Sequence, residues 1–175
     1  MTKRAKILWM DLEMTGLDAE KDQIIEVAAI ATDWKFKEID TYEAVIHRSD
    51  HVLETMNEWC VKQHGISGLT EKVRRSDKTD EQVENNLIDF VEKNFGKKTQ
   101  VLLAGNSIHI DRQFIDRKLP KFAKTLHYRM LDVTAWKVVF EGKYRKKFAK
   151  PEGHRALGDI RGSIEELEYY LGRIK

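Results

Sequence analysis

The most constraining feature of the sequence is an apolar run, residues 7–10, that continues directly into two carboxylates, Asp11 and Glu13. Such a run is typical of a buried β-strand. Side chains two residues apart in a strand point to the same face, so the two carboxylates are expected side by side at the end of a core strand. Repulsion and desolvation both oppose their ionisation. A chain that keeps this pair must also contain something that stabilises it.

Length and composition predict one domain over residues 1–175, since domains run to roughly 100–200 residues. Hydrophobic residues make up 41% of the chain, which is enough for a core, and only two prolines occur. No apolar stretch reaches the roughly 20 residues that span a bilayer, so no membrane partner is expected. Cys60 is the only cysteine, which excludes an intrachain disulfide and fits a reducing compartment. The segment MTKRAK precedes no hydrophobic signal core, so a transit peptide is expected to be absent or already removed.

The net charge of +2 hides an excess of basic residues in one part of the chain. Residues 99–150 contain twelve Lys and Arg against four Asp and Glu, and KYRKKFAK (143–150) is the densest stretch. A solvated loop and a phosphate-facing surface both explain this stretch. Charge alone does not decide between them.

The apolar pattern predicts five strands, and the second and third are expected to be antiparallel neighbours. They cover residues 6–13, 23–33, 38–47, 100–105 and 127–133. Together with the intervening helices they predict an α/β fold in which a mixed five-stranded sheet is flanked by helices.

Helical spacing occurs over residues 53–64, 79–95, 133–140 and 156–174. The second of these helices opens with a capping box of Thr79 and Gln82. Its apolar side is expected to contain Val83, Leu87, Val91 and Phe95. A further helix follows the strand at 100–105, and Asn106 or Ser107 is expected to cap it.

Two more carboxylates lie near the ends of predicted elements. Asp111 lies about one turn into the helix after residues 100–105, and Asp159 lies early in the last helix. Each alone is more often a cap or a surface charge than a ligand. Four carboxylates at one strand end are unstable unless cations neutralise them, and oxygen-only ligation selects Mg²⁺ or Mn²⁺. Two such ions about 3.5–4 Å apart form a clamp for phosphoryl hydrolysis.

His154 is the candidate general base. Pro151 and Gly153 indicate a loop directly before it, from which it can reach inward while Asp159 acts from the following helix. Histidine titrates near neutral pH and can take a proton from the attacking water. A histidine that only caps or packs on the loop remains the alternative.

Five segments together resemble one enzyme family, in the same order and over essentially the whole chain. They are DLEMTGLD, QIIEVA, AGNSIHIDRQF, LHYRMLDV and HRALGDIRGSIEEL. They resemble the oligoribonucleases, in the DEDDh branch of the RNase H-like 3′→5′ exonucleases. The resemblance implies an RNase H-like fold and a metal-dependent exoribonuclease that degrades very short RNA, from dinucleotides to short oligomers, to nucleoside 5′-monophosphates.

The same resemblance implies two divalent cations, Mg²⁺ or Mn²⁺, and a homodimer. The metal ligands of the family fall on Asp11, Glu13, Asp111 and Asp159, and its general base falls on His154. The segments MNEWC and HGISGLT resemble eukaryotic and mitochondrial members more than bacterial ones. A cytoplasmic protein is therefore expected, or a mitochondrial one in a mature eukaryotic form.

The resemblance also implies contacts with the bases and the 3′ end of the RNA. Leu17 would wedge against the bases and Trp59 would stack on one, which tolerates any base. His64 would hydrogen-bond the 3′ end. For Leu17 and Trp59, core packing is the alternative that the residues alone favour.

The 5′ phosphate would be enclosed by Ser107, Arg129 and Thr134, which limits the length of RNA that fits. Tyr128 would reach across the homodimer to the other chain's substrate. The family often has Ser at the position of Thr134, and the hydroxyl is retained here.

Two other functions fit the same residues. A proofreading or repair DNA exonuclease would use the same five catalytic residues. A nucleic-acid-binding module could retain the carboxylates after losing catalysis, although the intact motifs argue against it.

Overall fold

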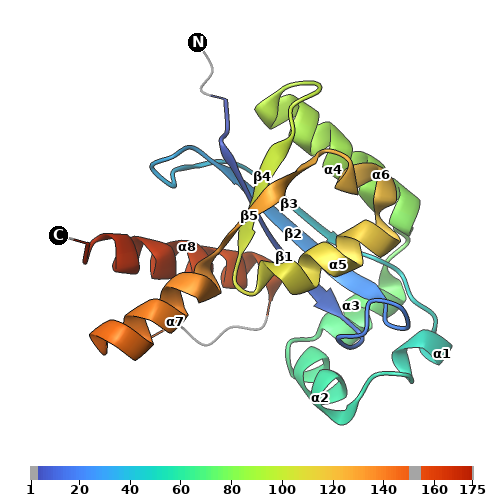
Figure 1. Cartoon of the computed structure of the whole chain (residues 1–175). Coiled ribbons are helices and arrows are strands. Elements are labelled where there is room, and N and C mark those ends of the chain that lie inside the picture. Colours follow the sequence, from blue (N-terminus) through green and yellow to red (C-terminus); the bar gives the residue numbers. More distant parts are fainter. Residues whose placement is uncertain (1–3, 150–154, 175) are drawn as a thin grey trace.

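The computed structural model describes residues 4–149 and 155–174 and contains one five-stranded sheet with the order β3-β2-β1-β4-β5 (Figure 1). The pairs β1–β2 and β2–β3 are antiparallel, whereas β1–β4 and β4–β5 are parallel. The strands are β1 Ile7–Met14, β2 Ile24–Thr32, β3 Glu38–Val45, β4 Val101–Gly105 and β5 Leu126–Asp132. The predicted mixed five-stranded sheet is confirmed.

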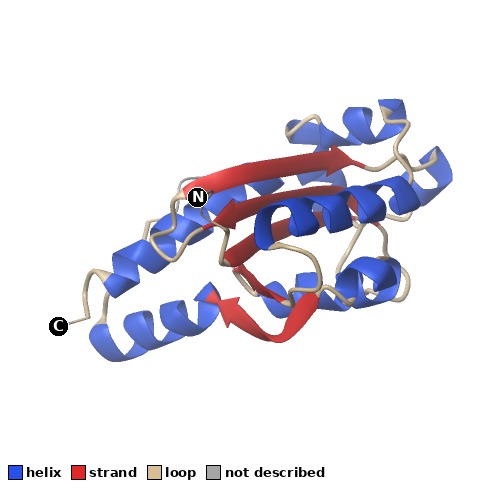
Figure 2. Cartoon of the chain, turned by 90° about the horizontal axis from the view of Figure 1, so that it is seen from above, coloured by secondary structure: helices blue, strands red, loops and turns tan. Residues whose placement is uncertain are grey.

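Helices cover both faces of the sheet, as the view from above shows (Figure 2). They are α1 Asp50–Leu53, α2 Glu58–Ile66, α3 Leu69–Arg75, α4 Asp80–Phe95, α5 Ile108–Lys118, α6 Pro120–Ala123, α7 Val133–Tyr144 and α8 Ala156–Leu171. Within the described ranges, no helix is long and apolar enough to cross a membrane.

The central strand β1 is buried on both faces, which explains its continuous apolar run. Leu8 and Met10 belong to the core that also contains the apolar side chains of α4 and α5. Ile7 and Trp9 belong to the core on the other face, which contains the apolar side chains of α8. Asp11 and Glu13 continue the alternation of Ile7 and Trp9, so β1 directs both carboxylates toward the face that α8 covers.

Most predicted helices are present, with two differences. The prediction of one helical stretch over residues 53–64 is wrong, because α1 ends at Leu53 and α2 begins at Glu58. Asn57 caps α2, accepting a hydrogen bond from the Cys60 N–H at 2.9 Å. Ser107 occupies the N-cap position of α5, but its φ of 48° is left-handed and its side chain makes no capping bond.

The predicted capping box of α4 is confirmed. The Thr79 hydroxyl accepts from the Gln82 N–H, and the Gln82 side chain accepts from the Thr79 N–H. The four apolar residues predicted for its inner side are all buried: Val83, Leu87, Val91 and Phe95.

Candidate active site

Three of the four predicted metal ligands lie together. Asp11 and Glu13 from β1 and Asp159 from the first turn of α8 each offer a carboxylate oxygen, and these oxygens lie within 4.8 Å of one another. Strand alternation brings the first two to the face where α8 packs. The structure therefore joins residues almost 150 positions apart in the sequence into one acidic group.

Asp111 lies directly beside this group. Its Oδ1 accepts a hydrogen bond from the backbone N–H of Leu12 at 3.0 Å, between the two carboxylates of β1. Parallel pairing of β4 with β1 brings the start of α5 to this place. Gly105 allows the close approach, because a Cβ there would lie 2.8 Å from the Met10 carbonyl oxygen.

The raised pKa values of Glu13 and Asp111 show that these carboxylates lack a neighbouring positive charge large enough to keep them ionised. Burial, followed by repulsion from Glu26, Asp159 and Asp111, raises the pKa of Glu13 from 4.5 to about 8. Burial also raises the pKa of Asp111, from 3.8 to about 7. Without an added positive charge, these carboxyls therefore hold protons near neutral pH.

The group fits divalent cations. All the donors are carboxylate oxygens, which hard cations such as Mg²⁺ and Mn²⁺ prefer. A cation would replace the protons that the raised pKa values indicate, and it would remove the repulsion between neighbouring ligands. Asp11, Glu13 and Asp159 would hold it, with Asp111 adjacent.

In metal-free buffer the free energy of unfolding is expected to fall as the pH rises from about 4 to about 8. Over this window the folded chain keeps protons on Glu13 and Asp111 that the unfolded chain has lost, because both folded pKa values are raised. Each pKa unit corresponds to about 1.4 kcal/mol, so the fall amounts to several kcal/mol. Urea unfolding at pH 5.5 and 8, with chelator and with Mg²⁺, measures it. Mg²⁺ is expected to stabilise more at pH 8, and unfolding free energy that rises with pH in chelator would contradict the prediction.

Glu26 and the partly exposed Arg155 form an ion pair next to these carboxylates that the sequence did not indicate. Glu26 is opposite Glu13 in the β1–β2 register and is almost fully buried. Arg155 Nε lies 3.1 Å from both of its carboxylate oxygens. The Arg155 charge also lowers the pKa of Glu13, against the larger effect of burial. His154, the predicted general base, lies outside the described residues.

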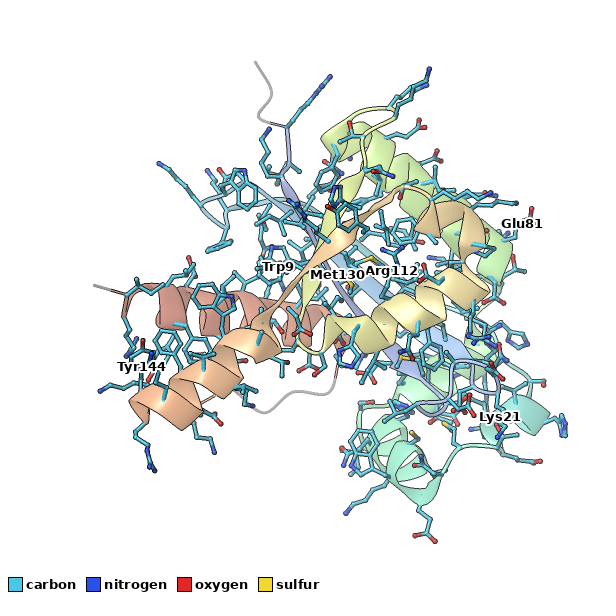
Figure 3. The ribbon with its side chains drawn as sticks, viewed as in Figure 1. Trp9, Lys21, Glu81, Arg112, Met130 and Tyr144 are labelled. Atoms are coloured by element: carbon cyan, nitrogen blue, oxygen red, sulfur yellow. The ribbon has the colours of Figure 1, made fainter. Side chains whose placement is uncertain are left out.

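Leu17 and Trp59 are exposed, so the core-packing alternative for both is wrong. Their exposed fractions are 72% and 60%. The turn that carries Leu17 is held by Asp22, whose carboxylate accepts from the Thr15 hydroxyl and the Asp18 N–H, each at 2.9 Å. Figure 3 labels Lys21 on this turn, at the end of the molecule where α2 also lies.

His64 is buried next to Glu13. Its Nε2 lies 2.9 Å from the Met14 carbonyl oxygen, and its Nδ1 lies 3.9 Å from Glu13 Oε2. A carbonyl oxygen only accepts, so Nε2 carries the proton and donates it. Burial lowers the pKa of His64, which favours the neutral ring. Its predicted contact with the 3′ end stays a prediction.

Ser107 and Thr134 lie together at the ends of β4 and β5. Their hydroxyl oxygens are 3.1 Å apart, and the Ser107 N–H donates to Thr134 Oγ1 at 2.8 Å. Asp132 fixes both residues, because its Oδ1 accepts from the N–H groups of Ser107 and Thr134.

Arg129 lies at the other end of β4 and β5 from Ser107 and Thr134. It lines a hollow at the starts of β4 and β5 together with Arg4, Lys6 and His127. Its guanidinium lies 5.4 Å from the ring centre of Tyr128, which is 73% exposed. Both residues belong to β5, the edge strand on which Figure 3 labels Met130.

Comparison with known proteins supports one family over nearly the whole chain. A family model described as an exonuclease matches residues 8–167. A probable oligoribonuclease of Dictyostelium discoideum is 46% identical, covering 94% of this chain and 88% of the relative. An oligoribonuclease of Francisella tularensis subsp. novicida is 44% identical, covering 99% and 98%. A mitochondrial oligoribonuclease of Homo sapiens is 41% identical, covering 97% and 73%.

Solved structures agree on the fold. A zinc-bound complex of E. coli ExoI with single-stranded DNA superimposes with a TM-score of 0.75 at 14% identity. The match covers 98% of this chain and 41% of that one, so this chain spans about two-fifths of that structure's length. The sheet and the carboxylates at the end of β1 thus belong to a protein of the exonuclease class. Within this class, the chain belongs to the oligoribonuclease family.

Proposed function

We propose that this protein is a metal-dependent 3′→5′ exoribonuclease that hydrolyses very short oligoribonucleotides, especially dinucleotides, to nucleoside 5′-monophosphates. One observation supports the proposal most strongly: the carboxylates of Asp11, Glu13 and Asp159 form a cluster, and Asp111 lies beside it. The chain that contains this cluster belongs to the oligoribonuclease family. We place the enzyme in the cytoplasm, or in mitochondria if the chain is a mature eukaryotic form.

Two divalent cations, Mg²⁺ or Mn²⁺, are the proposed cofactors, held by Asp11, Glu13, Asp111 and Asp159. When bound, they supply the positive charge that stabilises the phosphoryl transition state and lower the pKa of the attacking water. His154 takes a proton from that water as the general base. The exposed Leu17 and Trp59 contact the bases, and His64 contacts the 3′ end.

The 5′ phosphate is bound at the other end of the site. Ser107 and Thr134, already in contact, are two of its proposed ligands. Arg129 lies on the exposed edge strand next to Tyr128, so we place both on the surface through which a second chain binds. In the homodimer, Tyr128 of one chain reaches the substrate of the other, and Arg129 is the third proposed ligand of the 5′ phosphate.

Removing the 5′ phosphate from a dinucleotide is expected to weaken binding by about 1.5–3 kcal/mol, the usual size of a hydrogen bond to a charged group. Arg129→Ala should erase most of this difference while hydrolysis of the unphosphorylated dinucleotide continues. Arg161→Ala is the matched control, because Arg161 is an exposed arginine that pairs with Glu38 at the opposite edge of the sheet. The measurement is kcat/KM for both dinucleotides with each variant.

The alternatives give different results in the same assay. A general exonuclease would cleave two-nucleotide and much longer RNA or single-stranded DNA at equal rates, with no effect of the 5′ phosphate. A nucleic-acid-binding module would bind these substrates and release no mononucleotide with any divalent cation.

A further inference from the structure

Asn106 uses its whole side-chain amide to connect three parts of the chain. Its Nδ2 donates to Ser163 Oγ at 2.9 Å and to Glu166 Oε2 at 3.0 Å, both on α8. Its Oδ1 accepts from the hydroxyl of Thr134, on α7, at 3.2 Å. Asn106 itself lies between β4 and α5 in the chain. The start of α5 lies next to α8 and to the start of α7 (Figure 1).

The partners fix which way this amide faces. Glu166 is buried, and its other carboxylate oxygen accepts from the Tyr170 hydroxyl at 3.0 Å. A reversed amide would place an oxygen against this carboxylate, with no proton between them. The amide oxygen must therefore face Thr134, and Thr134 must donate its only hydroxyl proton to it.

This assignment determines the direction of the neighbouring hydrogen bonds. Because the Thr134 proton is used, Thr134 Oγ1 can only accept from Ser107, from its N–H at 2.8 Å and from its hydroxyl at 3.1 Å. The Ser107 hydroxyl is then the one that can turn from Thr134 to an incoming phosphate. The same bonds, with that of Asp132, hold Ser107 in its left-handed conformation.

The network also reaches the metal-ligand helix. Ser163 Oγ accepts from Asn106 and donates to the carbonyl oxygen of Asp159 at 2.9 Å. Asn106 thus joins Ser107 and Thr134 to the first turn of α8, where the Asp159 carboxylate belongs to the acidic group.

We propose that Asn106 is a positioning residue for 5′-end recognition. It fixes the Thr134 hydroxyl as an acceptor, so that the Ser107 hydroxyl is held ready for a terminal phosphate. The inference rests on the proposed function and divides the roles of the two hydroxyls at the 5′ phosphate: Ser107 donates to the phosphate, and Thr134 orients Ser107.

The test compares the ratio of kcat/KM for a 5′-phosphorylated dinucleotide to that for the same dinucleotide with a 5′ hydroxyl. Asn106→Ala is expected to lower this ratio at least about fivefold, chiefly through KM. Ser163→Ala is the matched control. It removes one of the hydrogen bonds between Asn106 and α8, and it leaves the hydrogen bond between Asn106 and Thr134 intact. It is expected to lower the Tm while keeping the ratio within twofold of wild type.

Asn106→Asp gives a second, nearly isosteric test. It keeps an oxygen for the Thr134 hydroxyl but loses the N–H donors to Ser163 and Glu166, so the Tm should fall while the ratio stays within threefold of wild type. The double variant Asn106→Ala/Thr134→Val should have the same ratio as Thr134→Val alone, since Asn106 acts through Thr134.

Three results would overturn the inference. They are an unchanged ratio in Asn106→Ala, an equal loss of the ratio in Ser163→Ala, and loss of the ratio in Asn106→Asp. If wild type itself shows a ratio near one, the 5′-phosphate site of the proposed function fails together with the role of Asn106. A high wild-type ratio with any of the three results overturns the role of Asn106 alone.

Discussion

Asp11→Asn is expected to lower the rate of RNA hydrolysis by about 10³-fold or more, since metal ions contribute several kcal/mol to such reactions. The variant removes one negative ligand from the group of three whose oxygens lie within 4.8 Å. It should remain folded, and in metal-free buffer it should be as stable as wild type or more stable, because repulsion is relieved.

The measurements are single-turnover hydrolysis with Mg²⁺ or Mn²⁺ and urea unfolding in chelator. Asp40→Asn is the matched control, because Asp40 is a carboxylate on β3 that pairs with Lys93 at the surface. It should retain wild-type turnover. An Asp11→Asn variant with turnover near wild type would remove Asp11 from the site.

His154→Ala is expected to lower kcat by about 10²–10⁴-fold, the usual contribution of a positioned general base, with KM almost unchanged. In the wild type, kcat should rise with pH as His154 loses its proton, because only the neutral imidazole accepts one from water. The variant should lose this rise.

His51→Ala is the control, since His51 is exposed on α1. The pH profile of kcat and the separate values of kcat and KM decide the role of His154. Activity lost only through a higher KM would make it a residue that positions substrate.

The carboxylates that we propose as metal ligands could be picked out in the sequence because each has a local signal. Strand alternation predicts that Asp11 and Glu13 share a face, and both helices that carry the other two carboxylates begin just before them. The five strands, in their sequence along the chain, and the capping box of α4 also depend on local patterns, and both are confirmed.

The partners of these residues have no local signal. Glu26 and Arg155 are 129 positions apart, and Asn106 and Ser163 are 57 apart. Such pairs depend on strand register and on the position in which α8 packs against the sheet. The exposure of a side chain also depends on the tertiary structure. The apolar character of Leu17 and Trp59 alone therefore favoured core packing, although both side chains lie at the surface.

The proposed activity is metal-dependent removal of nucleotides from the 3′ end of very short RNA. The most direct measurement follows 5′-labelled RNA of two to about ten nucleotides, and single-stranded DNA of the same sequences, with Mg²⁺, with Mn²⁺ and with chelator. We expect mononucleotide products that depend on the cation, stepwise shortening from the 3′ end, and the fastest cleavage for the RNA dinucleotide. Cleavage within the chain, activity that persists in chelator, or equal rates at all lengths and on DNA would contradict it.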